Sequence, residues 1–137
     1  MFAYGFERLE VWNLARAFFK DAYTLIDKFP FFEKNNLVDQ IRRATTSIVL
    51  NLAEMTSRSS LKEQAHFAEI AFGSTIEVYC SFLLAFDLRY INEQQFNEIQ
   101  LKIKEISNKI NALKKSQYER HQQLKRQTDS PKQINNL

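Results

Sequence analysis

Leu37 begins the clearest helical pattern in the chain, a line of apolar residues separated by three or four positions. These residues are Leu37, Ile41, Ala44, Ile48, Leu52 and Met55. Because an α-helix turns once every 3.6 residues, this spacing places them on one face of a helix of about five turns. A second line, which we call the polar stripe, runs beside that face: Gln40, Arg43, Ser47, Asn51 and Glu54. We therefore predict a helix at residues 33–56 whose polar side chains lie where a neighbouring helix packs.

The polar stripe has two interpretations. In the structural one it forms a buried network of hydrogen bonds and ion pairs with the third helix, where Glu77 is the natural partner for Arg43. Such a network fixes the register of two helices more than it adds stability. In the functional one it lines a pore or a pocket shared between subunits. The structural interpretation is the one we favour from the sequence.

A first helix is predicted at residues 7–29, because Pro30 cannot donate a backbone hydrogen bond and disfavours helical geometry in Phe29. Its apolar face is expected to consist of Val11, Trp12, Ala15, Phe19, Ala22, Tyr23 and Ile26. Phe29, Phe31 and Phe32 flank the proline. We expect these three aromatic side chains to cover the end of the bundle where the chain turns back.

The third predicted helix, at residues 61–89, is apolar around much of its circumference. Ser60 and Glu63 form a capping box, which starts the helix at Leu61. One face holds Phe67, Ala71, Ser74, Val78, Phe82, Ala85 and Leu88, and another holds Phe72, Ile76, Tyr79, Leu83, Phe86 and Tyr90. Together they cover far more than the roughly 100° stripe that a helix buried on one side needs. An exposed apolar strip of this size predicts oligomerisation through the third helix.

A fourth helix is predicted at residues 93–122, with Asn92 as its cap and Gln95 at the third position. Its apolar seam consists of Phe96, Ile99, Ile103, Ile106, Ile110 and Leu113. The fold class is therefore all-α, an antiparallel up-down-up-down four-helix bundle in residues 1–126, followed by a flexible tail at 127–137. The alternative is a three-helix bundle whose fourth helix swaps to a neighbouring chain.

Composition fits one helical domain, with 45% apolar and 26% charged residues but only 2 Gly and 2 Pro. Cys80 is the single cysteine, so no disulfide can form within the chain. The N-terminus lacks a signal-peptide pattern, and we see no apolar stretch long enough to span a bilayer. We therefore expect a cytoplasmic protein with no membrane partner.

The charge is distributed unevenly along the chain. Residues 1–100 contain 10 Lys/Arg and 13 Asp/Glu, whereas residues 101–137 contain 9 and 3, giving net charges of −3 and +6. A basic end suggests an acidic partner, usually RNA or DNA, although a solvated helix end and tail would have the same composition. The candidate phosphate-binding residues are Arg42, Lys102, Lys109, Lys114, Lys115 and Arg120. They do not form one clean stripe.

No pattern typical of an enzyme is present, and we expect no catalytic residue, cofactor or metal. Glu63 and His66 form an E-x-x-H, the spacing used by di-iron sites in four-helix bundles. Such a site needs a second E-x-x-H, but the only other histidine, His121, has no Glu three residues before it. Cys80 has no base supplied by a motif, so a packed thiol is the expected role.

Several segments of the chain together match the motifs of one known protein family. The matching motifs are Phe6-Glu7-Arg8-Leu9-Glu10-Val11-Trp12, Phe29-Pro30, Leu37-x-x-Gln40-Ile41-Arg42-Arg43-Ala44, Ser47-Ile48-x-x-Asn51-Leu52-Ala53-Glu54, Arg58, Phe67-x-x-Ile70-Ala71-x-Gly73-Ser74 and Glu77. Through these motifs the chain resembles, over roughly residues 6–115, the four-helix bundle family of proteins encoded in intervening sequences of 23S ribosomal RNA genes. The family usually has Gly where this chain has Met55, so the turn after the second helix is expected to begin a residue or two later.

This resemblance implies a subunit that assembles into a ring-like homopentamer, in agreement with the apolar third helix. It implies little about activity. Accessory proteins of diversity-generating retroelements resemble this bundle and are basic rings that partner a reverse transcriptase and bind nucleic acid. The resemblance thus suggests an oligomer that binds RNA or DNA non-specifically, or alternatively a protein-interaction scaffold or accessory subunit, for example to a reverse transcriptase.

Overall fold

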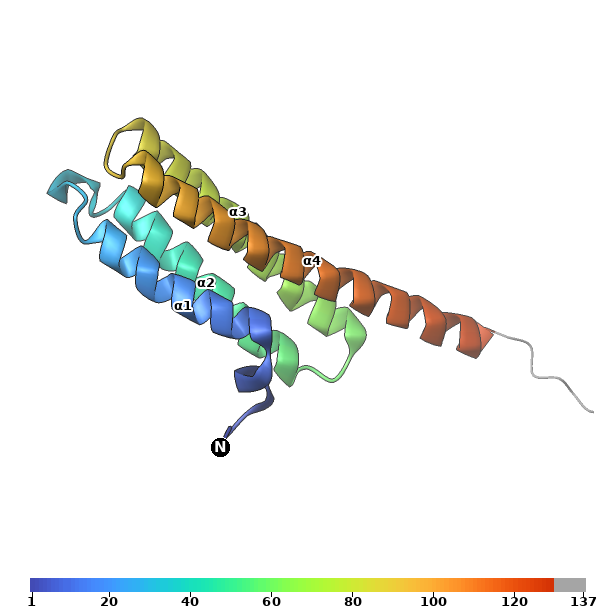
Figure 1. Cartoon of the computed structure of the whole chain (residues 1–137). Coiled ribbons are helices and arrows are strands. Elements are labelled where there is room, and N and C mark those ends of the chain that lie inside the picture. The colour runs from blue at the N-terminus through green and yellow to red at the C-terminus, as the bar shows by residue number, and fades with distance from the viewer. Residues whose placement is uncertain (130–137) are drawn as a thin grey trace, which may run out of the picture.

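The computed structural model describes residues 1–129, which form four long α-helices and two short 3₁₀ helices (Figure 1). In chain order the elements are η1 (Gly5–Arg8), α1 (Glu10–Ile26), η2 (Phe31–Glu33), α2 (Leu37–Ser57), α3 (Leu61–Asp87) and α4 (Glu93–Asp129). Each long helix contacts the next one in sequence, and α1 also contacts α4. This order of contacts is that of an up-and-down bundle, and the predicted all-α, four-helix fold is confirmed.

α1 begins three residues later than predicted, because η1 precedes it and Leu9, between them, has extended backbone. The buried side of α1 consists of Val11, Trp12, Ala15, Phe18, Ala22 and Ile26. Phe18, and not Phe19, therefore belongs to the core, while Tyr23 is 37% exposed. Phe19 and Tyr23 instead contact each other, with ring centroids 4.5 Å apart.

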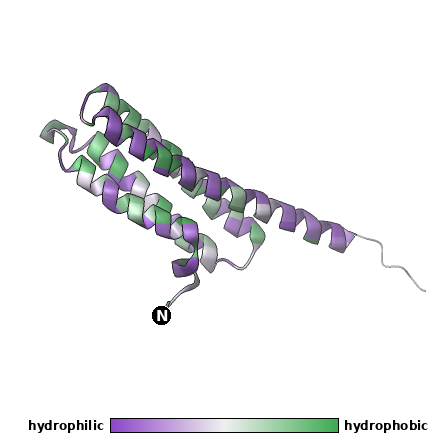
Figure 2. Ribbon diagram, viewed as in Figure 1, coloured by the Kyte–Doolittle hydropathy of each residue, from purple (hydrophilic) through white to green (hydrophobic). Residues whose placement is uncertain are grey.

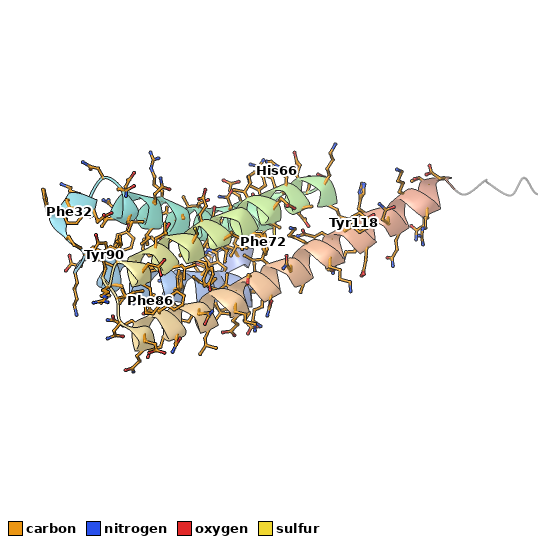
Figure 3. The ribbon with its side chains drawn as sticks, turned by 90° about the horizontal axis from the view of Figure 1, so that it is seen from above. Phe32, His66, Phe72, Phe86, Tyr90 and Tyr118 are labelled. Atoms are coloured by element: carbon orange, nitrogen blue, oxygen red, sulfur yellow. The ribbon has the colours of Figure 1, made fainter. Side chains whose placement is uncertain are left out.

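The turn between α1 and α2 differs from the expectation. Phe29 is buried, but Phe31 and Phe32 are 83% and 75% exposed. η2 is a tight turn of three residues, and the side chain that it directs into the bundle is Glu33. Figure 3 shows Phe32 at the extreme end of the molecule. The two aromatic rings thus project from the bundle end, and the prediction that they cover it was wrong.

Both remaining turns follow the signals in the sequence. α2 runs on to Ser57, two residues past Met55, as the missing glycine predicted. At the start of α3 the Ser60 hydroxyl oxygen accepts a hydrogen bond from the Glu63 backbone N–H at 3.1 Å, but within residues 1–129 the Glu63 carboxylate does not bond back to the Ser60 N–H, so only half of the predicted capping box forms. Before α4, the Asn92 and Gln95 side chains each accept a hydrogen bond from the other's backbone N–H, at 2.8 and 2.9 Å. These caps satisfy helix-end donors that would otherwise lack partners.

α3 ends in a left-handed turn at Arg89, whose φ is 63°. The Tyr90 backbone N–H bonds the Ala85 carbonyl, and the Arg89 N–H bonds the Phe86 carbonyl, both at 2.9 Å. This pair of bonds is the Schellman motif, in which glycine usually takes the left-handed position. The motif turns the chain so that Ile91 is buried and α4 runs back along α3.

α4 packs against α1 and α3 through its predicted seam, of which Phe96, Ile99, Ile103, Ile106 and Ile110 are buried. The helix continues to Asp129, seven residues beyond the predicted end, and extends past the other helices (Figures 1 and 3). The sequence after Gln117 lacks an apolar seam, but its Glu, Arg, Gln, Leu and Lys residues favour a helix intrinsically. The predicted tail at 127–137 is thus helical up to Asp129, and its remainder lies outside the described residues.

α3 is the most apolar helix of the bundle. Within residues 1–129 it is the one helix long and apolar enough, by length and composition alone, to cross a membrane. This finding corrects our expectation that no such stretch exists. A core helix carries the same signature, and α3 packs on both α2 and α4 with Val78, Phe82 and Ala85 fully buried.

Candidate functional site

The outer surface of α3 exposes large apolar side chains. Ile76, Leu84 and Leu88 are 50%, 48% and 52% exposed, and Ile70 and Leu83 are 37% exposed. Leu50 of the neighbouring α2 is 59% exposed. Single exposed apolar residues are common, but a group concentrated on one helix is typical of a surface that contacts another protein. Figure 2 shows hydrophobic residues along the ribbon of α3, whereas the end of α4 is mostly hydrophilic.

The centre of the polar stripe joins α2 to α3. The Ser47 and Ser74 hydroxyl oxygens are 2.7 Å apart in a hydrogen bond between the two helices. The Asn51 side-chain amide donates to the Ser47 hydroxyl oxygen at 3.0 Å and to the Ser47 carbonyl at 2.8 Å. All three side chains are buried or half-buried. This short network fixes the position of α2 along α3.

Gln40, Arg43 and Glu54, the other members of the polar stripe, do not join the hydrogen-bond network of Ser47, Asn51 and Ser74. Arg43 forms an ion pair with Asp39 at 3.6 Å, and Glu54 forms one with Arg58 at 3.0 Å, both within α2 or its end. Gln40 and Glu77 are exposed, and within residues 1–129 their side chains have no hydrogen bond or ion pair. Arg43 therefore does not pair with Glu77 of its own chain, because its side chain lies 78% exposed on the outer side of α2.

Three of the six candidate phosphate-binding residues form ion pairs between helices. Lys102 contacts Asp21 at 2.8 Å and Lys109 contacts Glu10 at 3.1 Å, both on α1, while Lys114 contacts Glu69 of α3 at 3.0 Å. The Lys114 ammonium also lies 4.7 Å from the centre of the Phe72 ring. These lysines hold α4 against its neighbours, and their charges are partly neutralised by the adjacent carboxylates.

The other three candidates lie at two ends of the bundle. Arg42 is in the second turn of α2, where it lines a hollow of about 480 Å³ with Tyr23 and Asp39. Lys115 and Arg120 are exposed on the part of α4 beyond its buried seam. None of the three has an ion pair with another described residue. The structure thus brings Lys115 and Arg120 onto one helical segment but leaves Arg42 far from it along the bundle axis.

His66 and Cys80 do not form a reactive centre in the described chain. His66 is exposed and packs its ring edge on Phe67, with centroids 5.3 Å apart. Cys80 is exposed, so the prediction of a packed thiol was wrong. Among residues 1–129 no group of three or more His, Cys, Asp and Glu side chains is placed to hold a metal ion.

Sequence reasoning missed the role of Glu33. This carboxylate is only 7% exposed, and it accepts hydrogen bonds from the Leu37 backbone N–H and the Tyr90 hydroxyl, both at 3.3 Å. It caps α2 and connects the α1–α2 turn to the end of α3. Burial, followed by the charge and hydrogen bond of Glu33, raises the pKa of Tyr90 above its ordinary value of 10.0. The signal available was an acidic residue at the first position of the predicted helix.

The arrangement defines a class of protein: an up-and-down bundle with a basic fourth helix and an apolar surface on its third. The model of the 23S rRNA-intervening sequence protein family matches residues 7–112, which is most of the chain, and the chain belongs to this family. No curated protein matches it.

Proposed function

We propose that this protein is a non-enzymatic homo-oligomer that binds RNA or DNA without sequence preference through the C-terminal part of α4, from Lys115, which still lies beside α3, into the segment that projects beyond the bundle. The observation that carries the proposal is the position of Lys115, Arg120 and Lys125, which are exposed and have no carboxylate partner within residues 1–129. A phosphate can approach these side chains without breaking an ion pair. Lys102, Lys109 and Lys114 would first have to leave Asp21, Glu10 and Glu69.

Assembly multiplies this charge. The exposed apolar side chains of α3 support self-association, and the family resemblance implies a pentamer. Five projecting helices would concentrate positive charge at one end of a ring. Phosphate contacts made by several subunits release counterions together, so binding weakens steeply as the salt concentration rises.

The proposal predicts that the double variant Lys115→Ser and Arg120→Ser binds nucleic acid more weakly. Fluorescence anisotropy with a labelled RNA duplex measures the affinity at several salt concentrations. We expect a loss of about tenfold at low salt and a salt slope smaller by about one for each contact removed. The control variant, Lys102→Ser with Lys109→Ser, removes the same charge from the ion-paired part of α4 and should change the affinity much less.

An unmodified protein that does not bind the duplex at low salt, or whose binding ignores salt, contradicts the proposal. A control variant as defective as the Lys115/Arg120 variant would also contradict it, because net charge rather than the projecting helix would then determine binding.

A second candidate function is a protein-interaction scaffold or an accessory subunit, for example to a reverse transcriptase. It is supported by Phe31 and Phe32, whose rings are exposed together at the bundle end opposite the projecting α4. Exposed aromatic side chains are typical of protein contact surfaces. The Lys115/Arg120 variant separates the two functions, because a scaffold keeps its protein partner when these charges are removed.

A further inference from the structure

α3 carries a second line of residues on its outer side, which we call the outer seam. It consists of Ile70, Gly73, Glu77, Cys80 and Leu84, all exposed, at successive separations of three and four residues. Helices that pack along one another place their contact residues at this spacing. The core of the same chain uses other residues of α3, among them Ala71, Val78 and Phe82. The outer seam is therefore a contact pattern that the subunit itself leaves unused.

Gly73 strengthens this interpretation. It lies in the middle of a helix of 27 residues, it does not have positive φ, and a Cβ atom built on it meets nothing within 4 Å. Glycine inside a helix is less favourable than alanine, and neither backbone geometry nor crowding within the subunit requires it here. A missing side chain at this point leaves room for another helix to come close.

Glu77 of the outer seam and Arg43 of α2 carry complementary charges and lie at nearly the same height along the bundle. The Ser47–Ser74 hydrogen bond sets the register of the antiparallel helices α2 and α3. Four residues before Ser47 is Arg43, which is therefore level with Val78, next to Glu77. Yet among residues 1–129 the one ion pair of Arg43 is with Asp39 at 3.6 Å, and the Glu77 carboxylate has no hydrogen-bond or ion-pair partner.

We propose that the outer seam of one copy packs against the outer side of α2 in a second copy, and that Arg43 of one copy pairs with Glu77 of the other. In a ring whose axis runs along the bundle, residues at equal height on adjacent copies meet. The ion pair that the sequence suggested within the chain then forms between chains. Gly73 allows the close approach, and exposed Leu50 of α2 supplies an apolar contact. This inference rests on the proposed homo-oligomer.

Charge reversal tests the pair directly. The variants are Arg43→Glu, Glu77→Arg and the double variant with both changes, and light scattering measures the mass of each. We expect each single reversal to lower the mass toward that of one subunit, 16.2 kDa, and the double variant to recover the mass of the unmodified protein. Lys28→Glu and Glu98→Arg are controls with exposed charges away from the seam, and they should leave the mass unchanged.

The possible results separate this inference from the proposed assembly. If the unmodified protein has the mass of one subunit, both are wrong. If it is an oligomer and neither single reversal changes its mass, or the double variant fails to recover, the Arg43–Glu77 pair is wrong while the assembly stands. Circular dichroism establishes that each variant folds. Should a reversal variant not fold, Arg43→Gln and Glu77→Gln replace it, and both are then expected to lower the mass.

Discussion

Glu33 shows how a single residue organises one end of this bundle. Its carboxylate caps α2 through the Leu37 N–H and accepts the hydroxyl of Tyr90, so it joins two turns that are distant in sequence. Tyr90 also packs on Phe29, with ring centroids 5.3 Å apart. A buried carboxylate is stable only when such donors surround it. The cluster therefore fixes how the α1–α2 and α3–α4 turns meet.

Tyr90→Phe is expected to destabilise the fold in a pH-dependent way. The folded-state pKa of Tyr90 is raised, so its stabilising contribution is complete below the unfolded value of 10.0 and is lost as the pH rises through the folded value. Urea denaturation should show the variant less stable than the unmodified protein near neutral pH. The difference should diminish at pH above about 10. A difference that stays constant over this range would contradict the interaction with Glu33.

Tyr118→Phe is the matched control for this measurement. Tyr118 is 63% exposed on the projecting part of α4, and its hydroxyl has no hydrogen bond within residues 1–129. The variant should match the unmodified protein in stability at each pH.

Single residues also show where sequence patterns fail. Phe18 and Phe19 are adjacent and equally apolar, so only the rotation of α1 in the bundle decides that Phe18 is buried. Phe31 and Phe32 are exposed because η2 is a tight turn, and a helical or strand pattern carries no information about such a turn. Cys80 is exposed because it lies on the outer seam, although its helix is the most apolar in the chain.

Among the elements, the helices were predictable because each has a regular apolar face and recognisable caps. The seam of α4 and the caps at Ser60 and Asn92 lie where the sequence placed them. Several helix ends were misjudged: α2 begins at Leu37 and not at residue 33, because the 3₁₀ helix η2 occupies Phe31–Glu33. α1 begins later than predicted because η1 precedes it, with the Phe6 ring packed on Trp12. α4 continues past its predicted end because the residues there favour a helix intrinsically, without an apolar seam.

The lysine pairs of α4 could not be read from the sequence, because they depend on how the helices align. Lys102 is 81 residues from Asp21, and only the packed bundle brings them to 2.8 Å. Half-exposed pairs of this kind contribute about 0.2–1 kcal/mol each. Their more important effect is on function. Three of the six predicted phosphate-binding residues are already paired with carboxylates and are therefore less available to a phosphate.

The core seam of α4 should carry most of the energy that holds this helix in place. Ile110 is fully buried, so Ile110→Ala should lower the free energy of unfolding by about 2–5 kcal/mol. Leu101 is on the same helix and 70% exposed, so Leu101→Ala should change it by less than about 0.5 kcal/mol. Urea denaturation followed by circular dichroism measures both. Equal effects would mean that α4 does not pack as described.

At the scale of the whole molecule, the sequence reveals what one subunit contains but not what it contacts. The width of the apolar surface on α3 indicated a contact with another protein, and four large apolar side chains of α3, together with Leu88 directly after it, are exposed in the subunit. Helical periodicity does not tell which partner makes this contact, because a second copy of the chain and a different protein would bury the same kind of apolar surface. The basic end of α4 likewise indicates an acidic partner without naming it.

The decisive experiment is the mass of the purified protein by light scattering, alone and with a short RNA duplex, at low and at moderate salt. We predict about five times the subunit mass of 16.2 kDa, an increase with RNA at low salt, and a return to the RNA-free value as the salt concentration rises. The mass of a single subunit under these conditions would contradict the proposed assembly. A pentamer whose mass ignores RNA at low salt would contradict nucleic-acid binding and leave the scaffold function.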